Sequence, residues 1–170
     1  MDLFKQYFIT TNSLKKDKRL DIFFTGTSHA PFNLKYPERY HQKLSKDIST
    51  LSSSEDKEHF EKYRNYYASL YNVDDALRYF LTQYSNRSDY HKTIFIITGD
   101  HPMTEIPNEN DLKKYHVPLI LFTPTIQCPQ VFKEFASHLD LYESILGFYI
   151  RNTQFKFPQP CKTIHPKSND

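Results

Sequence analysis

The chain has 170 residues, which is enough for one domain with a buried core. Hydrophobic residues make up 38% and charged residues 25%, so the composition is that of a globular protein and not of a disordered one. The net charge of +2, from 22 basic and 20 acidic residues without a Lys/Arg cluster, argues against a nucleic-acid partner. The three glycines, Gly26, Gly99 and Gly147, are too scattered to build a phosphate-cradling or dinucleotide-binding loop.

The cysteines and the apolar segments limit the protein further. Cys128 and Cys161 are too few for a Cys-rich zinc module, and the sequence leaves open whether they form a disulfide. No run approaches the roughly 18 apolar residues of a membrane span, and the first residues do not resemble a signal peptide. We therefore expect a cytoplasmic protein, or a piece of a longer secreted or membrane-tethered one.

The first half of the chain predicts one strand and one long helix. Residues 20–25 form a short apolar run before Gly26, which is typical of a buried strand that enters a loop. Residues 33–58 are polar and predict a surface excursion with at most short helices. From His59 to Tyr84 apolar residues recur every three or four positions, which predicts one amphipathic helix. Asp74 falls on its apolar stripe and should need a partner there.

The second half predicts two strands and a helix. Residues 93–98 are continuously apolar, as in a central strand that is covered on both faces, and residues 117–122 predict another strand. Ser137 and Asp140 resemble a capping box that opens a helix through Phe148, before a polar tail at 151–170. We therefore predict an α/β fold, an α/β/α sandwich around a mostly parallel central sheet, with residues 1–170 as one domain.

Asp100 and His101 follow the strand at 93–98 directly, where open α/β sheets bind their ligands. A carboxylate beside an imidazole suits a divalent cation that prefers oxygen and nitrogen ligands, such as Zn²⁺ or Mn²⁺. The alternative is that Asp100 caps a turn after Gly99 and that His101 is an ordinary surface residue.

Three more histidines are candidates for substrate binding. His29 follows the first predicted strand, so we expect it to face Asp100 and His101 and to bind an anionic oxygen or act as an acid. His116 precedes its strand and would reach the site only if residues 102–114 fold back over it. His138 has a competing structural role at the start of a helix.

Taken together, five short segments resemble motifs of the sulfatase-like branch of the alkaline phosphatase superfamily. The likeness is nearest to lipoteichoic acid synthases and to phosphoethanolamine or phosphoglycerol transferases. It covers roughly residues 18–150, in family order: Thr25–Phe32 ("T-x-SH-x-PF"), Tyr67–Phe80, Thr93–His101 ("TI-hydrophobic-TGDH"), His116–Ile120 ("HVPLI") and Ser137–Asp140 ("SH-x-D").

The resemblance implies an enzyme that hydrolyses or transfers a phosphate or sulfate ester, with a lipid headgroup as one candidate substrate. Asp100 and His101 would be ligands of a divalent metal (Zn, Mn, Mg or Ca), and His29 would contact substrate. His116 and His138 would contact substrate or a second metal. The full-length protein would be extracytoplasmic and membrane-tethered.

Two features depart from the family pattern. Pro102 stands where the family usually has Gly after "DH", and no nucleophile-bearing segment precedes His29. Thr10 and Thr11 match the nucleophile in letter only. The chain therefore resembles the C-terminal half of such a catalytic domain, inactive without the half that supplies the nucleophile. The alternatives are a non-catalytic binding or regulatory module that keeps the fold, and a plain α/β interaction domain in which "GDH" is a turn.

Overall fold

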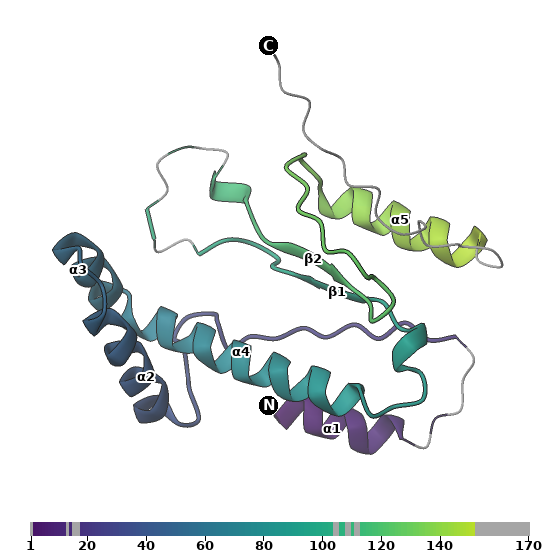
Figure 1. Ribbon diagram of the computed structural model, residues 1–170, viewed down its shortest axis with the longest axis horizontal. Coiled ribbons are helices and arrows are strands. Elements are labelled where there is room, and N and C mark those ends of the chain that lie inside the picture. Colours follow the sequence, from purple (N-terminus) through teal and green to yellow (C-terminus); the bar gives the residue numbers. More distant parts are fainter. Residues whose placement is uncertain are drawn as a thin grey trace, which may run out of the picture. The chain divides into compact units, whose positions relative to one another are not determined.

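The computed structural model describes residues 2–12, 14, 18–103, 106–107, 110 and 113–151, with side chains through residue 148 in the last helix. The chain divides into two compact units (Figure 1). Unit 1 contains residues 1–90 and 102–115, and unit 2 contains residues 91–101 and 116–170. The predicted tail beyond residue 151 and the cysteine at position 161, and with it the pairing of Cys128, lie outside the described residues.

Unit 1 is built from helices. They are α1 (Asp2–Thr11), α2 (Pro37–Ser49), α3 (Ser54–Lys62) and α4 (Arg64–Tyr84). A short 3₁₀ turn at Lys113–Tyr115 also belongs to unit 1, and another at Tyr90–Lys92 lies where the chain passes from unit 1 to unit 2. Helix α1 was not predicted, although Phe4 in its first turn is buried.

The core of unit 1 is a cluster of aromatic rings around Phe80 of α4. The Phe80 ring lies 4.7 Å from that of Phe4 and 5.6 Å from that of Phe8, both on α1, which runs beside α4 (Figure 1). Phe23 adds a third ring at 5.4 Å from the segment that follows α1. Tilted and edge-on arrangements of this kind add to the stability that apolar burial supplies, so α1 and residue 23 are anchored on α4.

Helix α2 packs on α4 through a helix face whose residues are regularly spaced in the sequence. Its buried residues Tyr40, Leu44 and Ile48 recur every four positions, which is the spacing of one helix face. An ion pair of 2.7 Å between Arg39 and Asp75 joins the same two helices. The prediction of at most short helices in residues 33–58 is therefore wrong for this regular helix of 13 residues.

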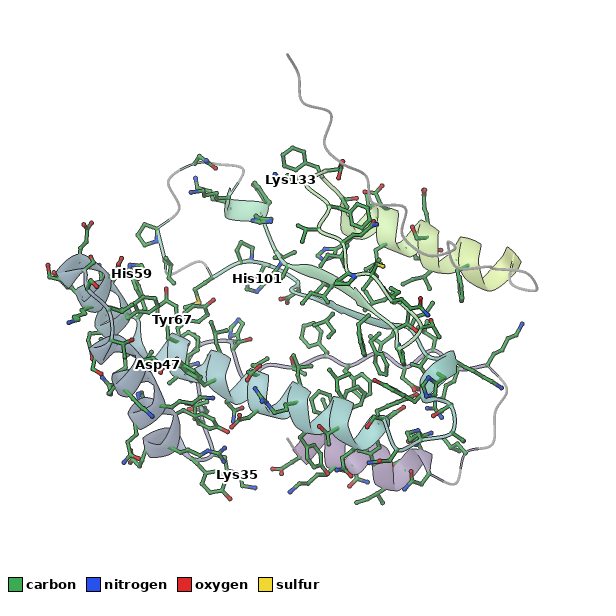
Figure 2. The ribbon with its side chains drawn as sticks, in the orientation of Figure 1. Lys35, Asp47, His59, Tyr67, His101 and Lys133 are labelled. Carbon is green, nitrogen blue, oxygen red and sulfur yellow. The ribbon has the colours of Figure 1, made fainter. Side chains whose placement is uncertain are left out.

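The single helix predicted from His59 to Tyr84 is wrong, because it breaks at Tyr63. This residue ends α3 and precedes α4, with φ −105° and ψ 30°. In a straight helix, residues seven apart are separated by about 10 Å along the axis. The rings of Phe60 and Tyr67 instead lie 4.5 Å apart, and His59 Nε2 lies 2.9 Å from the Tyr67 hydroxyl (Figure 2). The bend at Tyr63 thus brings the two helices into ring contact.

Unit 2 contains the sheet. Strand β1 (Phe95–Thr98) pairs with β2 (Leu119–Phe122), which confirms both predicted strands. The pairing is antiparallel, with Thr98 opposite Leu119. Helices with this small sheet fit the predicted α/β class, but the predicted parallel sheet is not what the described residues form. A parallel pair needs a long crossover, usually helical, and the described part of the link between these strands holds only a 3₁₀ turn.

Helix α5 (His138–Arg151) begins with the predicted capping box. The Ser137 backbone N–H donates to Asp140 Oδ2 over 2.7 Å, and the Asp140 N–H donates to Ser137 Oγ over 3.3 Å. These reciprocal bonds satisfy donors that a helix N-terminus otherwise leaves open. The hydrogen bonds that the Asp140 carboxylate accepts from the Ser137 backbone and hydroxyl lower its pKa.

The strand predicted at residues 20–25 is absent from the described residues, where this segment is extended but unpaired with another strand. Only Phe23 turns toward the aromatic core, whereas Ile22 is 84% and Phe24 80% exposed. Only one side chain of this segment is partly buried, so the segment is not a strand covered on both sides. None of the described helices is long and apolar enough to cross a bilayer.

Candidate functional site

Asp100 and His101 lie where β1 ends, as predicted. Gly99 follows the strand, and a methyl group in place of its hydrogen would lie 3.4 Å from the Val117 side chain. Gly99 therefore lets the chain pass close to the residues that enter β2 before it presents the two polar side chains. Both side chains are open to solvent, 60% exposed for Asp100 and 52% for His101.

The contacts of the two side chains are compatible with both interpretations of the sequence and do not decide between them. Asp100 Oδ1 accepts a hydrogen bond of 3.0 Å from the His101 backbone N–H, which is a turn-capping contact. Asp100 Oδ2 lies 3.8 Å from His101 Nε2, close enough for both atoms to face one cation. One carboxylate oxygen thus orders the turn while the other stays beside the imidazole.

His116 lies at the same end of the sheet as Asp100, for a reason that the sequence did not give. The strands are antiparallel, so the start of β2 lies beside the end of β1. A Cβ built on Gly99 would lie 3.4 Å from the Val117 side chain, so this proximity continues past the paired residues. Strand pairing is therefore sufficient to bring His116 to this edge.

His138 is also held at this end of β1. Its Nε2 lies 3.3 Å from the Thr98 hydroxyl, which joins the first residue of α5 to the last residue of the strand. The sequence analysis missed Thr98. Its hydroxyl at the solvent-exposed end of an otherwise apolar strand was the available signal.

The donor types at this edge suit a divalent metal, but the set is incomplete. Asp100 supplies carboxylate oxygen and His101 imidazole nitrogen, the ligands that Zn²⁺ and Mn²⁺ accept. Within the described part of the chain, no three His, Cys, Asp or Glu side chains lie close enough together to hold a metal ion. The residues therefore fit as part of a metal site that needs further ligands.

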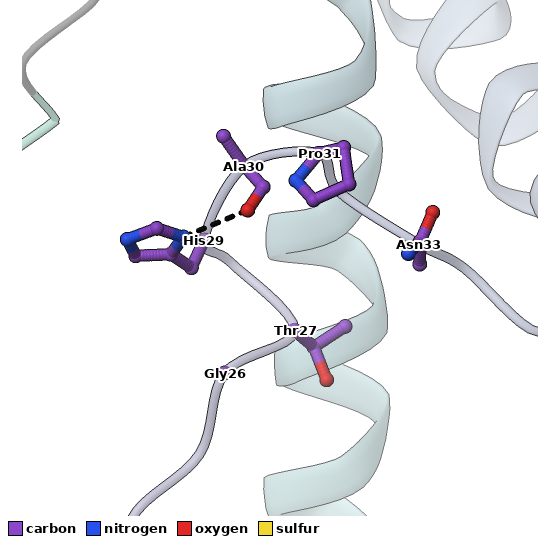
Figure 3. Close-up of a pocket in the computed structure, with 6 residues that line it drawn as sticks. All are labelled: Gly26, Thr27, His29, Ala30, Pro31 and Asn33. Carbon is purple, nitrogen blue, oxygen red and sulfur yellow. Dashed lines mark hydrogen bonds between the residues drawn. The ribbon is translucent and has the colours of Figure 1, made fainter.

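His29 belongs to unit 1 and lies in the turn that follows Gly26. His29 N–H donates to the Gly26 carbonyl over 3.1 Å, and Phe32 N–H donates to the His29 carbonyl over 2.9 Å. The turn lines a shallow hollow of about 460 Å³ with residues 26, 27, 29–31 and 33 (Figure 3). His29 Nδ1 points at the Ala30 carbonyl, 2.8 Å away. Its approach to Asp100 stays a prediction.

Phe32 ends this turn in a conformation that a bulky residue seldom adopts. Its φ of 58° lies in the left-handed region, where Cβ crowds the backbone. Its ring packs edge-on against Tyr66 of α4, 6.0 Å between centroids. Strained residues of this kind concentrate around ligand sites.

Thr10 and Thr11 lie inside α1 and do not have the setting of a nucleophile. The Thr10 hydroxyl donates to the Gln6 carbonyl over 3.0 Å, and the Thr11 hydroxyl donates to the Tyr7 carbonyl over 2.8 Å. Such back-bonding to the preceding helical turn is an ordinary role for a threonine in a helix. No base activates either hydroxyl through these contacts.

Comparison with protein families gives one match. The family model described as Sulfatase matches residues 1–149, which is most of the chain. Comparisons with curated proteins and with solved structures returned no match.

Proposed function

Because the chain belongs to the sulfatase family, we propose that Asp100 and His101 are ligands of a divalent metal in a site that hydrolyses or transfers a phosphate or sulfate ester. The observation that carries the proposal is the arrangement at the end of β1. Asp100 Oδ2 and His101 Nε2 lie 3.8 Å apart on an exposed edge. When bound, the metal would polarise the ester oxygen and lower the pKa of the attacking group.

The histidines would act on the substrate anion. His116 and His138 lie at the same end of the sheet as the proposed ligands, as the β1–β2 pairing and the Thr98 hydrogen bond indicate. Imidazolium N–H groups are suitable donors to non-bridging phosphate or sulfate oxygens. We assign them, together with His29, to substrate binding.

We further propose that the nucleophile comes from a segment outside residues 1–170. The helical, back-bonded positions of Thr10 and Thr11 support this assignment. The motifs at residues 25–32 and 93–101 favour the lipid-headgroup transferase branch, which would place the working enzyme outside the cytoplasm and on a membrane. Residues 1–170 alone should leave 4-nitrophenyl phosphate and 4-nitrophenyl sulfate uncleaved, and turnover by this purified chain would contradict the assignment.

Metal binding is tested with Mn²⁺, whose paramagnetism broadens the NMR signals of nearby nuclei even when binding is weak. We expect the amide signals of residues 99–101 to broaden in the native chain and to stay sharp in Asp100→Ala. Asp74→Ala is the matched control, because Asp74 is an exposed carboxylate that pairs with its helix neighbour Arg78 at 3.1 Å. Equal broadening in the native chain and in Asp100→Ala would favour the interaction domain in which Asp100 only caps a turn.

A further inference from the structure

Unit 2 carries large apolar side chains that are open to solvent. Val131, Phe132 and Phe135 are 89%, 76% and 94% exposed, in the irregular segment of residues 123–137 between β2 and α5. This segment runs back along the sheet before it enters α5 (Figure 1). Soluble proteins expose single apolar residues routinely, but a group of them usually marks an interaction site.

Helix α5 continues this apolar surface. Leu139 and Tyr142 in its first two turns are 77% and 65% exposed, and Leu146 is 43% exposed. Their positions follow the spacing of one helix face, whereas Leu141 and Ile145 lie on another face and are half-buried. The helix therefore has a second apolar face that is turned to solvent. The apolar patch of unit 2 consists of Val131, Phe132, Phe135, Leu139, Tyr142 and Leu146.

The segment that carries the first half of the apolar patch has no net charge. Between residues 124 and 137 the charged residues are Lys133 and Glu134, whose charges cancel. The Lys133 N–H donates to the Glu134 carboxylate over 3.0 Å, so the acid is engaged within the segment. A neutral apolar surface of this kind is not directed to a strongly charged partner, and it suits an interface that is itself without net charge.

The form of the apolar patch favours lipid over a folded protein. Phe132 and Phe135 project from an irregular segment, and a protein partner would need a surface shaped to match them. The boundary between headgroups and acyl chains is fluid, so it accepts protruding apolar side chains in any arrangement. An amphipathic helix lies flat in this boundary, and a tyrosine such as Tyr142 is at home at the headgroup level.

We propose that unit 2 binds the surface of a zwitterionic bilayer by burying the apolar patch at the boundary of headgroups and acyl chains. The inference rests on the proposed function, because an enzyme that acts on a lipid headgroup meets its substrate at that surface. Binding comes from apolar area and not from charge, so it is reversible and insensitive to salt.

A single tryptophan tests where the patch goes, because the chain has no tryptophan of its own. In Phe135→Trp, vesicles of phosphatidylethanolamine and phosphatidylcholine should shift the emission to shorter wavelength as the indole leaves water. Tyr36→Trp is the matched control, since Tyr36 is an aromatic residue of unit 1 that is 60% exposed and outside the patch. Its emission should not change when vesicles are added.

Cosedimentation of the chain with the same vesicles measures how much each side chain contributes. Phe132→Ser should lower the partition coefficient about tenfold, because much of one phenylalanine's apolar area no longer leaves water. Gln130→Ser, changed at an exposed polar position of the same segment, should partition like the native chain. Raised salt should leave the partition of the native chain unchanged.

Three outcomes overturn the proposal. One is a Phe135→Trp emission that vesicles leave unchanged, and another is equal partition of Phe132→Ser and Gln130→Ser. The third is an emission shift that appears without lipid as the protein concentration rises, which would assign the patch to a second copy of the chain. Asp100→Ala should lose the Mn²⁺ broadening and keep its vesicle binding, so failure of the metal site and failure of the membrane surface give different results.

Discussion

The Thr98 hydroxyl and His138 Nε2 lie 3.3 Å apart, so the end of β1 and the start of α5 are joined by a side-chain hydrogen bond. Asp100 follows Thr98 by two residues, which places this bond beside the proposed metal ligands. His138 is therefore both the first residue of a helix and a side chain fixed at the site edge. Replacing its partner Thr98 separates the structural role of His138 at the helix start from its proposed role in substrate binding.

Replacing Thr98 by Val removes the hydroxyl and keeps the shape of the side chain. The hydroxyl makes two hydrogen bonds, to His138 and, at 3.2 Å, to the Gly99 carbonyl. We expect the free energy of unfolding to fall by about 0.5–1.5 kcal/mol for each bond lost. Amide hydrogen exchange in the first turn of α5 should also become faster. Urea unfolding with Thr25→Val as control, a second exposed threonine, measures the first effect. Unchanged exchange in α5 would mean that the bond does not hold the helix.

Two neighbouring aspartates on α4 test which face of the helix meets α2. Asp75 bonds to Arg39 at 2.7 Å and its side chain is 16% exposed, whereas the Asp74 side chain is 58% exposed. We expect Asp75→Asn to lower the free energy of unfolding by about 1 kcal/mol. Asp74→Asn should change it by less than about 0.5 kcal/mol. Urea denaturation of both variants measures these two changes. Equal losses of unfolding free energy would mean that the α4 face carrying Asp75 is not the face that contacts α2.

Asp74 falls on the predicted buried stripe only if Leu70 is counted as a buried residue, whereas Leu70 is 38% exposed. The buried residues of α4 include Ala68, Ala76 and Phe80, which lie on another face.

The break of the predicted helix at Tyr63 is a separate matter. Periodicity cannot reveal this break, because Phe60 and Tyr67 also fit a continuous helix. The contact between their rings is a tertiary contact. Only the three-dimensional structure therefore distinguishes a continuous helix from one broken at Tyr63.

The polar residues that follow β1 could be predicted from the sequence. The reason why His116 lies at the same edge could not. Gly99, Asp100 and His101 end an apolar run, which is a local signal. The position of His116 depends on whether β2 runs parallel or antiparallel to β1, and a short apolar strand is compatible with both. The prediction of a buried strand at residues 20–25 was wrong for a related reason. The apolar residues of this segment are buried only if a neighbouring strand pairs with it.

Tyr71 makes the stability of unit 1 sensitive to alkaline pH. Its hydroxyl donates to the Asp47 carboxylate, and this bond, with burial as the second cause, raises its pKa from 10.0 to about 12. A raised folded-state pKa means that the unfolded chain releases this proton first. The stabilising contribution is therefore complete below pH 10 and is lost as the pH rises toward 12.

We expect the native chain to lose more unfolding free energy between pH 9 and about 11 than Tyr71→Phe does, since phenylalanine has no proton to release. Tyr36→Phe, changed at an exposed position, should follow the native chain. Tyr7, whose pKa is raised by burial and by its bond to Asp21, contributes in the same direction and leaves a residual slope in Tyr71→Phe. Guanidinium titrations at the two pH values give the comparison, and parallel losses in all three proteins would rule out Tyr71 as the cause.

The proton position on His29 is fixed by its neighbour. A carbonyl oxygen only accepts hydrogen bonds, so the 2.8 Å contact with Ala30 requires the proton on Nδ1. In the neutral ring, Nε2 is then the basic nitrogen. It becomes a donor to an anion only when the ring takes up a second proton.

We therefore expect ¹⁵N NMR of the His29 ring to show the Nδ1–H tautomer in the free chain. Addition of inorganic phosphate should change the Nε2 signal more than the Nδ1 signal, because Nδ1 already contacts the Ala30 carbonyl. His91, an exposed histidine of the 3₁₀ turn, is the internal reference whose ring should respond less. An Nε2–H tautomer in the free chain would contradict the contact with Ala30, and no response to phosphate would remove His29 from the substrate site.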